Sequence, residues 1–264
     1  MAADALYTTP DEATIAYEVS GDGPPFGYAH GVLLSRAAVR GLGLFDIDAI
    51  AADRRLLTYD QRGHGHSSGG AVAEDYRFER AATDLLGVLD AAGIDEPIDF
   101  AGSSLGAAAA LYAALAAPDR FHRLVLVIPP VSWETGAQQA RHWYANTARR
   151  IDEIGPAAWR TEWSRGEPLP IFADYPQARF SPDVPDELLA SVVRGVGLSE
   201  LPDPDAMSAL AHPTLILAWD TDPLHPVSTA ARLHELIPDS ILSVARSVAE
   251  VKTWTRRTAE FFRA

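Results

Sequence analysis

The sequence predicts an α/β protein built on a mostly parallel sheet with helices on both faces. Short apolar runs of strand length alternate with helical stretches along most of the chain, a pattern typical of parallel strands joined by helices. The turn Gly102-Ser103-Ser104-Leu105-Gly106 stands between an apolar run and an alanine-rich stretch, as a strand-turn-helix unit requires. The 264 residues, 47% of them hydrophobic, are enough for one such domain with a small insertion.

The expected elements follow one another along the chain in a simple order. The strands are short apolar runs, expected near 13–19, 25–30, 55–60, 97–102, 122–128, 213–219 and 240–245. The helices are longer stretches between them, expected near 37–52, 76–92, 105–117, 226–237 and 249–262. Between Pro129-Pro130 and His212 the alternation stops, and proline, arginine and aromatic residues become more frequent.

Ser104 is the candidate nucleophile. It follows the apolar run Pro97-Ile98-Asp99-Phe100-Ala101 and precedes the helical stretch from Ala107 to Ala117. Glycines at both ends of G-x-S-x-G let the strand and the helix approach closely, so the serine sits in a strained turn with its hydroxyl exposed above the sheet. An ordinary Gly/Ser turn before a helix has the same short pattern, so other segments have to agree.

Three further segments do agree, and with them the chain resembles the α/β-hydrolase family from about residue 5 to its end. The segment from Pro24 to Gly31 looks like that family's third strand and its His-Gly turn. The segment from Leu56 to Ser67 is similar to the fourth strand and the loop that follows it, and the segment from Pro213 to Pro226 resembles the strand and turn that carry the acid. Four motifs in family order are far more specific than any one of them.

The resemblance also implies the domain layout. It implies an eight-stranded sheet in a core of residues 1–130 and 208–264, with a small helical cap, residues 131–207, inserted after strand 6. The cap holds four of the six tryptophans, Trp133 among them. Aromatic residues at this density pack a small cap that lacks its own core, or line an apolar pocket beneath it. Both roles can hold for different residues. Trp133 is expected to line the pocket and to contact substrate.

A serine hydroxyl attacks a carbonyl only if a base takes its proton and donors stabilise the oxyanion. The resemblance implies that the two donors are the backbone N–H groups of Val32 and Leu105. His30 shapes the preceding turn in this family, so it is expected beside the substrate but not as a catalyst.

Asp222 is the expected acid. The family spacing D-x-x-x-P is met by Asp222 and Pro226, so we favour Asp222 over Asp220, which reads as a solvated turn residue. Trp219 stands where relatives usually carry glycine. Its indole is expected to narrow the site or to form a wall that contacts substrate.

The base is where the sequence departs from the family. Relatives place the catalytic histidine in the loop after the last strand, and residues 243–250 contain none. His225, three residues past Asp222, is either an alternative base or a turn residue beside the acid. His64 and His66 follow the fourth strand and are the next candidates for the base, and His66 is also expected to contact substrate.

The remaining candidates for the catalytic base are weaker. His234 lies in an expected helix and reads as a helix-face residue, while His122, His142 and His212 read as structural, surface or cap residues. Arg246 is able to pair with Asp222, but it does not deprotonate at accessible pH and cannot serve as a base.

Three functions remain open at this point. The first is a serine hydrolase of a small neutral ester, lactone or related acyl compound, whose catalytic base departs from the family pattern. The second is a lyase or cyclase of the same fold that acts on an apolar metabolite. The third is a non-catalytic small-molecule binding protein, because loss of the histidine of a triad lowers turnover on the order of a millionfold.

Composition narrows the partners. A net charge of −14 argues against a nucleic-acid or anionic membrane surface, so a neutral or apolar small molecule is expected. The absence of cysteine excludes disulfides and a thiolate nucleophile, and no cofactor or metal is expected. The first residues lack the pattern of a secretory signal, which points to a cytoplasmic protein.

Overall fold

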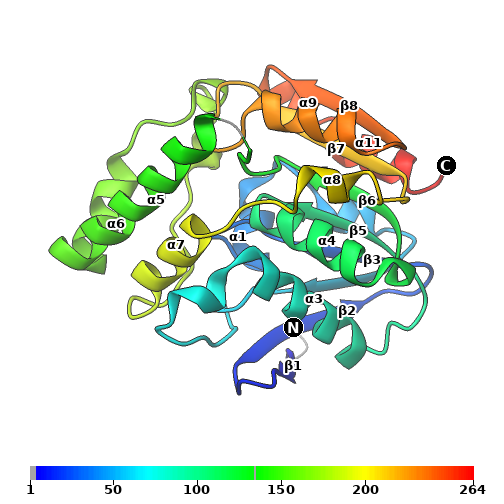
Figure 1. Ribbon diagram of the computed structural model, residues 1–264, viewed down its shortest axis with the longest axis horizontal. Coiled ribbons are helices and arrows are strands. Elements are labelled where there is room, and N and C mark those ends of the chain that lie inside the picture. Colours follow the sequence, from blue (N-terminus) through cyan, green and yellow to red (C-terminus); the bar gives the residue numbers. More distant parts are fainter. Residues whose placement is uncertain (1–3, 134) are drawn as a thin grey trace.

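An eight-stranded sheet runs through the protein in the order β1-β2-β4-β3-β5-β6-β7-β8 (Figure 1). The computed structural model describes residues 4–133 and 135–264. Strands β1 and β2 are antiparallel to their neighbours and all other neighbouring strands are parallel, so the predicted mostly parallel sheet is confirmed. The strands are β1 (Ala5–Thr8), β2 (Thr14–Ser20), β3 (Pro25–Ala29), β4 (Arg55–Tyr59), β5 (Ile98–Ser103), β6 (Phe121–Val127), β7 (Thr214–Trp219) and β8 (Ser240–Ala245).

Strand β1 is the strand that the apolar pattern did not place. It lies at the edge of the sheet, pairs with β2, and keeps most of its side chains exposed. Its apolar run, Ala5-Leu6-Tyr7, is only three residues long and mostly exposed, so the position of the strand is set by backbone pairing with β2 more than by burial.

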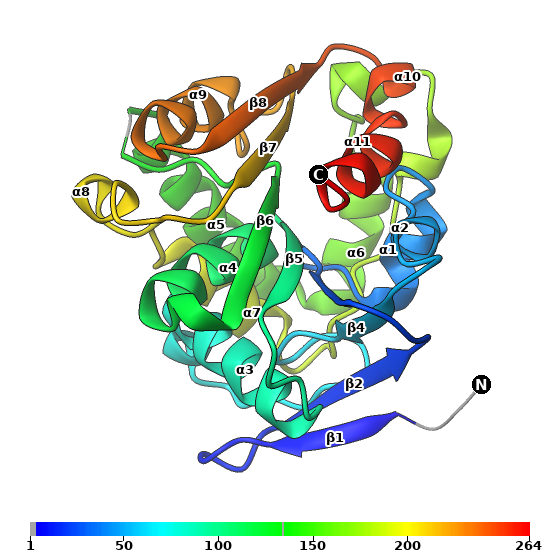
Figure 2. The same cartoon turned by 90° about the vertical axis from the view of Figure 1, so that its right-hand side faces the viewer.

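Helices cover both faces of the sheet (Figure 2). One face carries α3, α4 and α9, whose Leu85, Leu111 and Leu233 belong to one buried cluster, and the other carries α1, α2 and α11, whose Ile47 and Trp254 belong to a second cluster. No helix of the described residues is long and apolar enough to cross a membrane. The bounds are α1 (Arg36–Leu42), α2 (Ile47–Ile50), η1 (Ala73–Tyr76), α3 (Phe78–Ala91), α4 (Leu105–Ala116), η2 (Pro118–Arg120), α9 (Val227–Leu236), α10 (Val248–Val251) and α11 (Trp254–Phe261).

Two helices expected as continuous are broken. The stretch near 37–52 divides into α1 and α2, because Gly43 adopts a left-handed conformation (φ 61°) that ends α1, and the Asp46 side chain caps the start of α2. The stretch near 249–262 divides into α10 and α11. Neither break was visible in hydrophobic periodicity, which continues across a tight turn.

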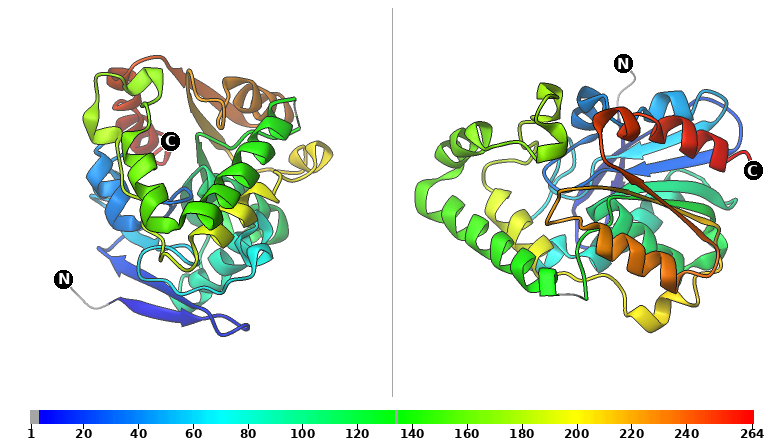
Figure 3. Two further views of the ribbon diagram at one scale, coloured as in Figure 1. Left: turned by 90° about the vertical axis from the view of Figure 1, so that its left-hand side faces the viewer. Right: turned by 90° about the horizontal axis from the view of Figure 1, so that it is seen from above.

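The segment between β6 and β7 forms a helical layer beyond one end of the sheet (Figure 3). Its aromatic residues pack on one another, with ring centroids 5.3 Å apart for Trp159 and Trp163 and 5.5 Å apart for Trp163 and Phe180. The backbone N–H of Asp183 donates to the Leu33 carbonyl, which ties this layer to the loop after β3. Its elements are α5 (Thr135–Ile154), α6 (Pro156–Arg165), η3 (Pro170–Phe172), η4 (Pro176–Ala178) and α7 (Leu189–Gly197), followed by α8 (Pro204–Met207), which contacts α9.

Candidate active site

Ser104 lies in a sharp turn between β5 and α4. Its backbone adopts φ 52° and ψ −111°, a conformation that non-glycine residues rarely take. The flanking glycines are required by contact, since a Cβ on Gly102 would lie 2.2 Å from the Gly106 carbonyl oxygen, and a Cβ on Gly106 would lie 2.3 Å from the Ala29 oxygen. The close approach of strand and helix therefore holds the serine in the strained turn described for a nucleophile elbow.

The structure brings Ser104, His225 and Asp222 into one line of hydrogen bonds. His225 Nε2 lies 2.8 Å from Ser104 Oγ, and His225 Nδ1 lies 2.7 Å from Asp222 Oδ2. An ionised carboxylate only accepts hydrogen bonds, so Nδ1 carries the proton and Nε2 is free to accept from the serine hydroxyl. This tautomer is the one a general base needs.

Asp222 is held as an anion at the end of β7. It is buried, and its Oδ1 accepts from the backbone N–H of Leu224 at 2.9 Å, while Oδ2 also accepts from Trp219 Nε1 at 3.0 Å. Burial on its own raises the pKa of Asp222, but the charge of His225 and the hydrogen bonds from His225, Trp219 and Leu224 outweigh it and lower the pKa to about 2. The carboxylate is therefore charged at neutral pH.

The two expected oxyanion donors flank Ser104. Leu105 is the first residue of α4, so its N–H is one of the helix N-terminal amides that have no acceptor within the helix. Val32 follows Gly31, where a Cβ would come within 3.3 Å of Ser104 Cβ, which places this loop directly against the serine. Both Val32 and Ser104 line the same cavity.

Two buried histidines shape the loop that carries Val32. His30 Nδ1 lies 2.8 Å from the Gly31 carbonyl, and the Gln61 N–H donates to His30 Nε2. The Leu33 N–H donates to His64 Nε2 at 3.1 Å. Burial, reinforced by the neighbouring His30, lowers the pKa of His64 to about 3, so it stays neutral and keeps accepting this bond.

Several predicted substrate contacts lie elsewhere. His30 is fully buried beneath the loop instead of facing the cavity. The His66 side chain is 77% exposed and pairs with Asp4 on the surface, because its loop turns outward after the buried Asp60. Trp133 packs against the larger buried cluster and is not among the cavity-lining residues of the described chain, whereas Trp219 does line the cavity.

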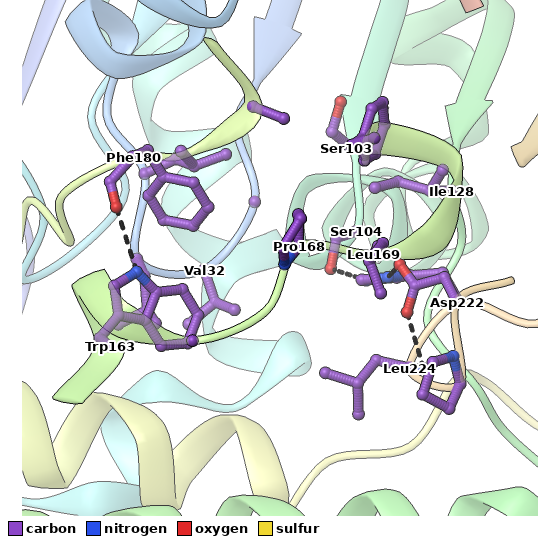
Figure 4. Close-up of a pocket in the computed structure, with 18 of the residues that line it drawn as sticks. Val32, Ser103, Ser104, Ile128, Trp163, Pro168, Leu169, Phe180, Asp222 and Leu224 are labelled. Atoms are coloured by element: carbon purple, nitrogen blue, oxygen red, sulfur yellow. Dashed lines mark hydrogen bonds and ion pairs between the residues drawn. The ribbon is translucent and has the colours of Figure 1, made fainter. Parts of the chain in front are cut away.

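A cavity of about 650 Å³ opens above Ser104 and His225 (Figure 4). Figure 4 shows Ser104 and Asp222 among apolar side chains that include Ile128, Leu169 and Leu224. The polar side chains Gln139, Glu167 and Arg179 line its exposed rim. The aromatic wall comes mainly from the inserted layer and consists of Trp143, Tyr144, Trp163, Phe172 and Phe180, with Trp219 from β7.

The loop after β8, the position at which relatives carry the catalytic histidine, has a structural role here. Ser247 caps α10 by accepting from the Glu250 N–H, and the Arg246 N–H donates to the Glu250 carboxylate. Within the described residues, Arg246 makes no ion pair with Asp222, whose bonding partners are Trp219, Leu224 and His225. Residues 4–133 and 135–264 also contain no group of three or more His, Asp or Glu placed to hold a metal ion.

The chain belongs to the α/β hydrolase fold family, whose pattern matches residues 24–163. A protein of Azorhizobium caulinodans named carbamate hydrolase RutD is 28% identical over 89% of this chain and 87% of its own length. Its counterpart of the same name in Klebsiella pneumoniae is 32% identical over 73% of each chain.

A lactonase and an esterase of known structure are also similar to this chain. The 3-oxoadipate enol-lactonase 2 of Acinetobacter baylyi is 25% identical over 72% of this chain and 69% of its own length. A thermophilic esterase from Thermogutta terrifontis has the same fold, with a TM-score of 0.78 at 23% identity over 99% of this chain and 97% of that chain. These proteins are named as hydrolases and esterases, which supports the predicted hydrolase class.

Proposed function

We propose that this protein is a serine hydrolase of small neutral esters or lactones, with Ser104 as nucleophile, His225 as general base and Asp222 as the acid that orients the base. The observation that carries the proposal is the continuous pair of hydrogen bonds from Ser104 through His225 to Asp222. In it the base comes from the turn that carries the acid, three residues further along the chain, and not from the loop after β8.

The steps follow from this geometry. His225 Nε2 takes the proton as Ser104 Oγ attacks the carbonyl carbon, and the N–H groups of Val32 and Leu105 receive the charge that develops on the carbonyl oxygen. The imidazolium, stabilised by Asp222, then donates its proton to the leaving oxygen, which departs as an alcohol and leaves an acyl-serine. Water deprotonated by His225 attacks the acyl-serine, and the carboxylic acid leaves with Ser104 restored.

The cavity supports an apolar, uncharged substrate. Its inner wall is aromatic and aliphatic, and apart from Asp222, which is paired with His225, its charged lining residues Glu167 and Arg179 lie at the exposed rim. A net charge of −14 adds long-range repulsion for anionic compounds. A ligand-binding protein has no need for a serine in a strained turn with a base in bonding distance, so we favour hydrolysis over the binding, lyase and cyclase alternatives.

Kinetics on a matched ester series tests the proposal. We expect wild-type protein to hydrolyse 4-nitrophenyl acetate, butyrate and hexanoate, and Ser104→Ala and His225→Ala each to lower kcat by on the order of 10⁴- to 10⁶-fold. The exposed His234 on α9 provides the matched control, because His234→Ala removes an imidazole at a distance from the cavity and leaves the rate unchanged. Full activity of His225→Ala would remove this residue as the base.

A further inference from the structure

We propose that Trp219 is a positioning residue that aims the Asp222 carboxylate at His225 through its indole N–H. The proposal rests on the proposed function, because it assigns a role within the same line of hydrogen bonds. It begins from an unusual feature of the acid: Trp219 Nε1 and His225 Nδ1 both donate to Oδ2 of Asp222, at 3.0 and 2.7 Å.

The shared turn explains why the acid needs an outside support. Asp222 and His225 are three residues apart, and the backbone bond that closes their turn, from the His225 N–H to the Asp222 carbonyl, is long at 3.3 Å. The Leu224 N–H, on the same turn, fixes Oδ1. Trp219 is the donor that reaches the carboxylate from the strand, so it ties the direction of Oδ2 to β7 and not to the turn itself.

The indole is itself held in place. Its ring stacks on Trp254 with centroids 5.8 Å apart and planes 11° apart, and Trp254 is fully buried. The ring of Phe172 packs against it almost perpendicularly, with centroids 4.8 Å apart. Because rings on two sides limit rotation of the indole, its N–H remains directed at Asp222.

The second donor also changes the electrostatics of the pair. A hydrogen bond withdraws part of the carboxylate charge, so Asp222 stabilises a charged imidazole less strongly while the Trp219 bond is present. Loss of the Trp219 donor therefore has two effects, one on the position of the carboxylate and one on the protonation of His225. The carboxylate loses the donor that holds it from the strand and is then held only by groups of its own turn, which slows turnover. Its charge is also less compensated, which makes protonation of His225 easier.

The spectroscopic test follows protonation of His225 by NMR, using its Nδ1 proton and its ring nitrogens, and needs no substrate. The variants are Trp219→Phe and a protein with 3-benzothienylalanine at position 219, which keeps the shape of the indole and lacks the N–H. The isostere leaves no space for a water to replace the donor. Phe180→Leu is the control, because it alters the cavity wall at a ring that packs on Trp163 and leaves the two rings that hold Trp219 unchanged.

We expect both position-219 variants to move the midpoint of the His225 titration upward by about half a pH unit or more, with the larger shift in the isostere. The other titratable or charged side chains of the described chain that face this base across the cavity, Tyr144, Glu167 and Arg179, are the same in all variants. An unchanged midpoint in the isostere overturns the proposal.

Activity on a 4-nitrophenyl ester separates this proposal from the proposed function. If Trp219 only forms the wall, the isostere keeps the wild-type kcat, which also overturns the proposal. If it positions the acid, kcat falls about 10-fold with KM within about 2-fold, since the defect is in an interaction used in the transition state. A fault in the proposed function itself would show in Ser104→Ala retaining activity, whatever the titration of His225 does.

Discussion

Replacing Asp222 by asparagine isolates what the buried charge does at this site. Among the described residues, the three hydrogen-bond partners of the carboxylate are all donors: the Leu224 N–H on Oδ1, and the Trp219 and His225 N–H groups on Oδ2. An asparagine NH₂ placed on either side therefore faces a donor. Of these three partners, His225 is the one able to adapt, by moving its proton to Nε2 and accepting through Nδ1. In that tautomer Nε2 no longer accepts the Ser104 proton.

Two magnitudes follow. The wrong tautomer lowers kcat by on the order of 10⁴-fold, with little change in substrate binding. The pKa of Asp222 lies at about 2 against an ordinary value of 3.8, and a shift of that size corresponds to about 2 to 3 kcal/mol of folding free energy. Because the folded-state pKa is the lower one, this stability is present above the ordinary pKa and is lost as pH falls from about 5 to about 2.

The assay combines ester kinetics with urea unfolding of Asp222→Asn at several pH values. We expect the variant to be less stable than wild type by about 2 to 3 kcal/mol at pH 7, and the difference to close towards pH 2. The control is Asp220→Asn, the neighbouring exposed acid, which changes the same chemical group outside the hydrogen-bond line. Equal kcat in wild type and Asp222→Asn, or a stability gap that does not depend on pH, would refute this reasoning.

Three further changes give distinct outcomes. Gly106→Ala should destabilise the fold by about 1 to 3 kcal/mol in urea unfolding and lower kcat, because its Cβ would lie 2.3 Å from the Ala29 oxygen; wild-type stability would contradict the tight elbow. Tyr144→Phe removes the one phenol among the described residues that line the cavity, and burial, followed by the charge of Asp222, raises the pKa of this phenol. Steady-state kinetics should show KM changed by about 3- to 10-fold with kcat nearly constant. A large fall in kcat would instead place this hydroxyl in the chemistry. Ser247→His should give no gain in ester hydrolysis and should lower thermal stability by about 1 kcal/mol through loss of the α10 cap, whereas a rise in activity would place the base in that loop.

The strands and the placement of Ser104 and Asp222 near each other were predictable because they depend on local patterns. Buried parallel strands require apolar runs, and those runs located seven strands within a residue or two. The elbow at Ser104 and the position of Asp222 follow from short spacings along the chain. The edge strand β1 has only four residues and buries little, so its short apolar run was too weak a signal to identify it.

The remaining features depend on how distant segments meet. The orientation of the His225 side chain depends on the turn that carries it. A hydrogen bond from the Val131 N–H to the Leu224 carbonyl joins this turn to the chain after β6. That bond joins residues 93 positions apart in the sequence. Likewise, the donor role of Trp219 comes from its stack on Trp254, and the outward turn of His66 comes from its bonds to Asp60 and Asp4. A single sequence carries none of these contacts.

The rate at which Ser104 reacts with a fluorophosphonate, followed by intact mass and located by peptide mass spectrometry, tests the central claim most directly. It reports the nucleophile and its base together and needs no knowledge of the substrate. We predict a single adduct on Ser104 in wild type, no adduct in Ser104→Ala, and labelling slowed by at least about 100-fold in His225→Ala but unchanged in His234→Ala. Equal labelling rates in wild type and His225→Ala, or an adduct on any other residue, would contradict the assignment of His225 and Asp222 to Ser104.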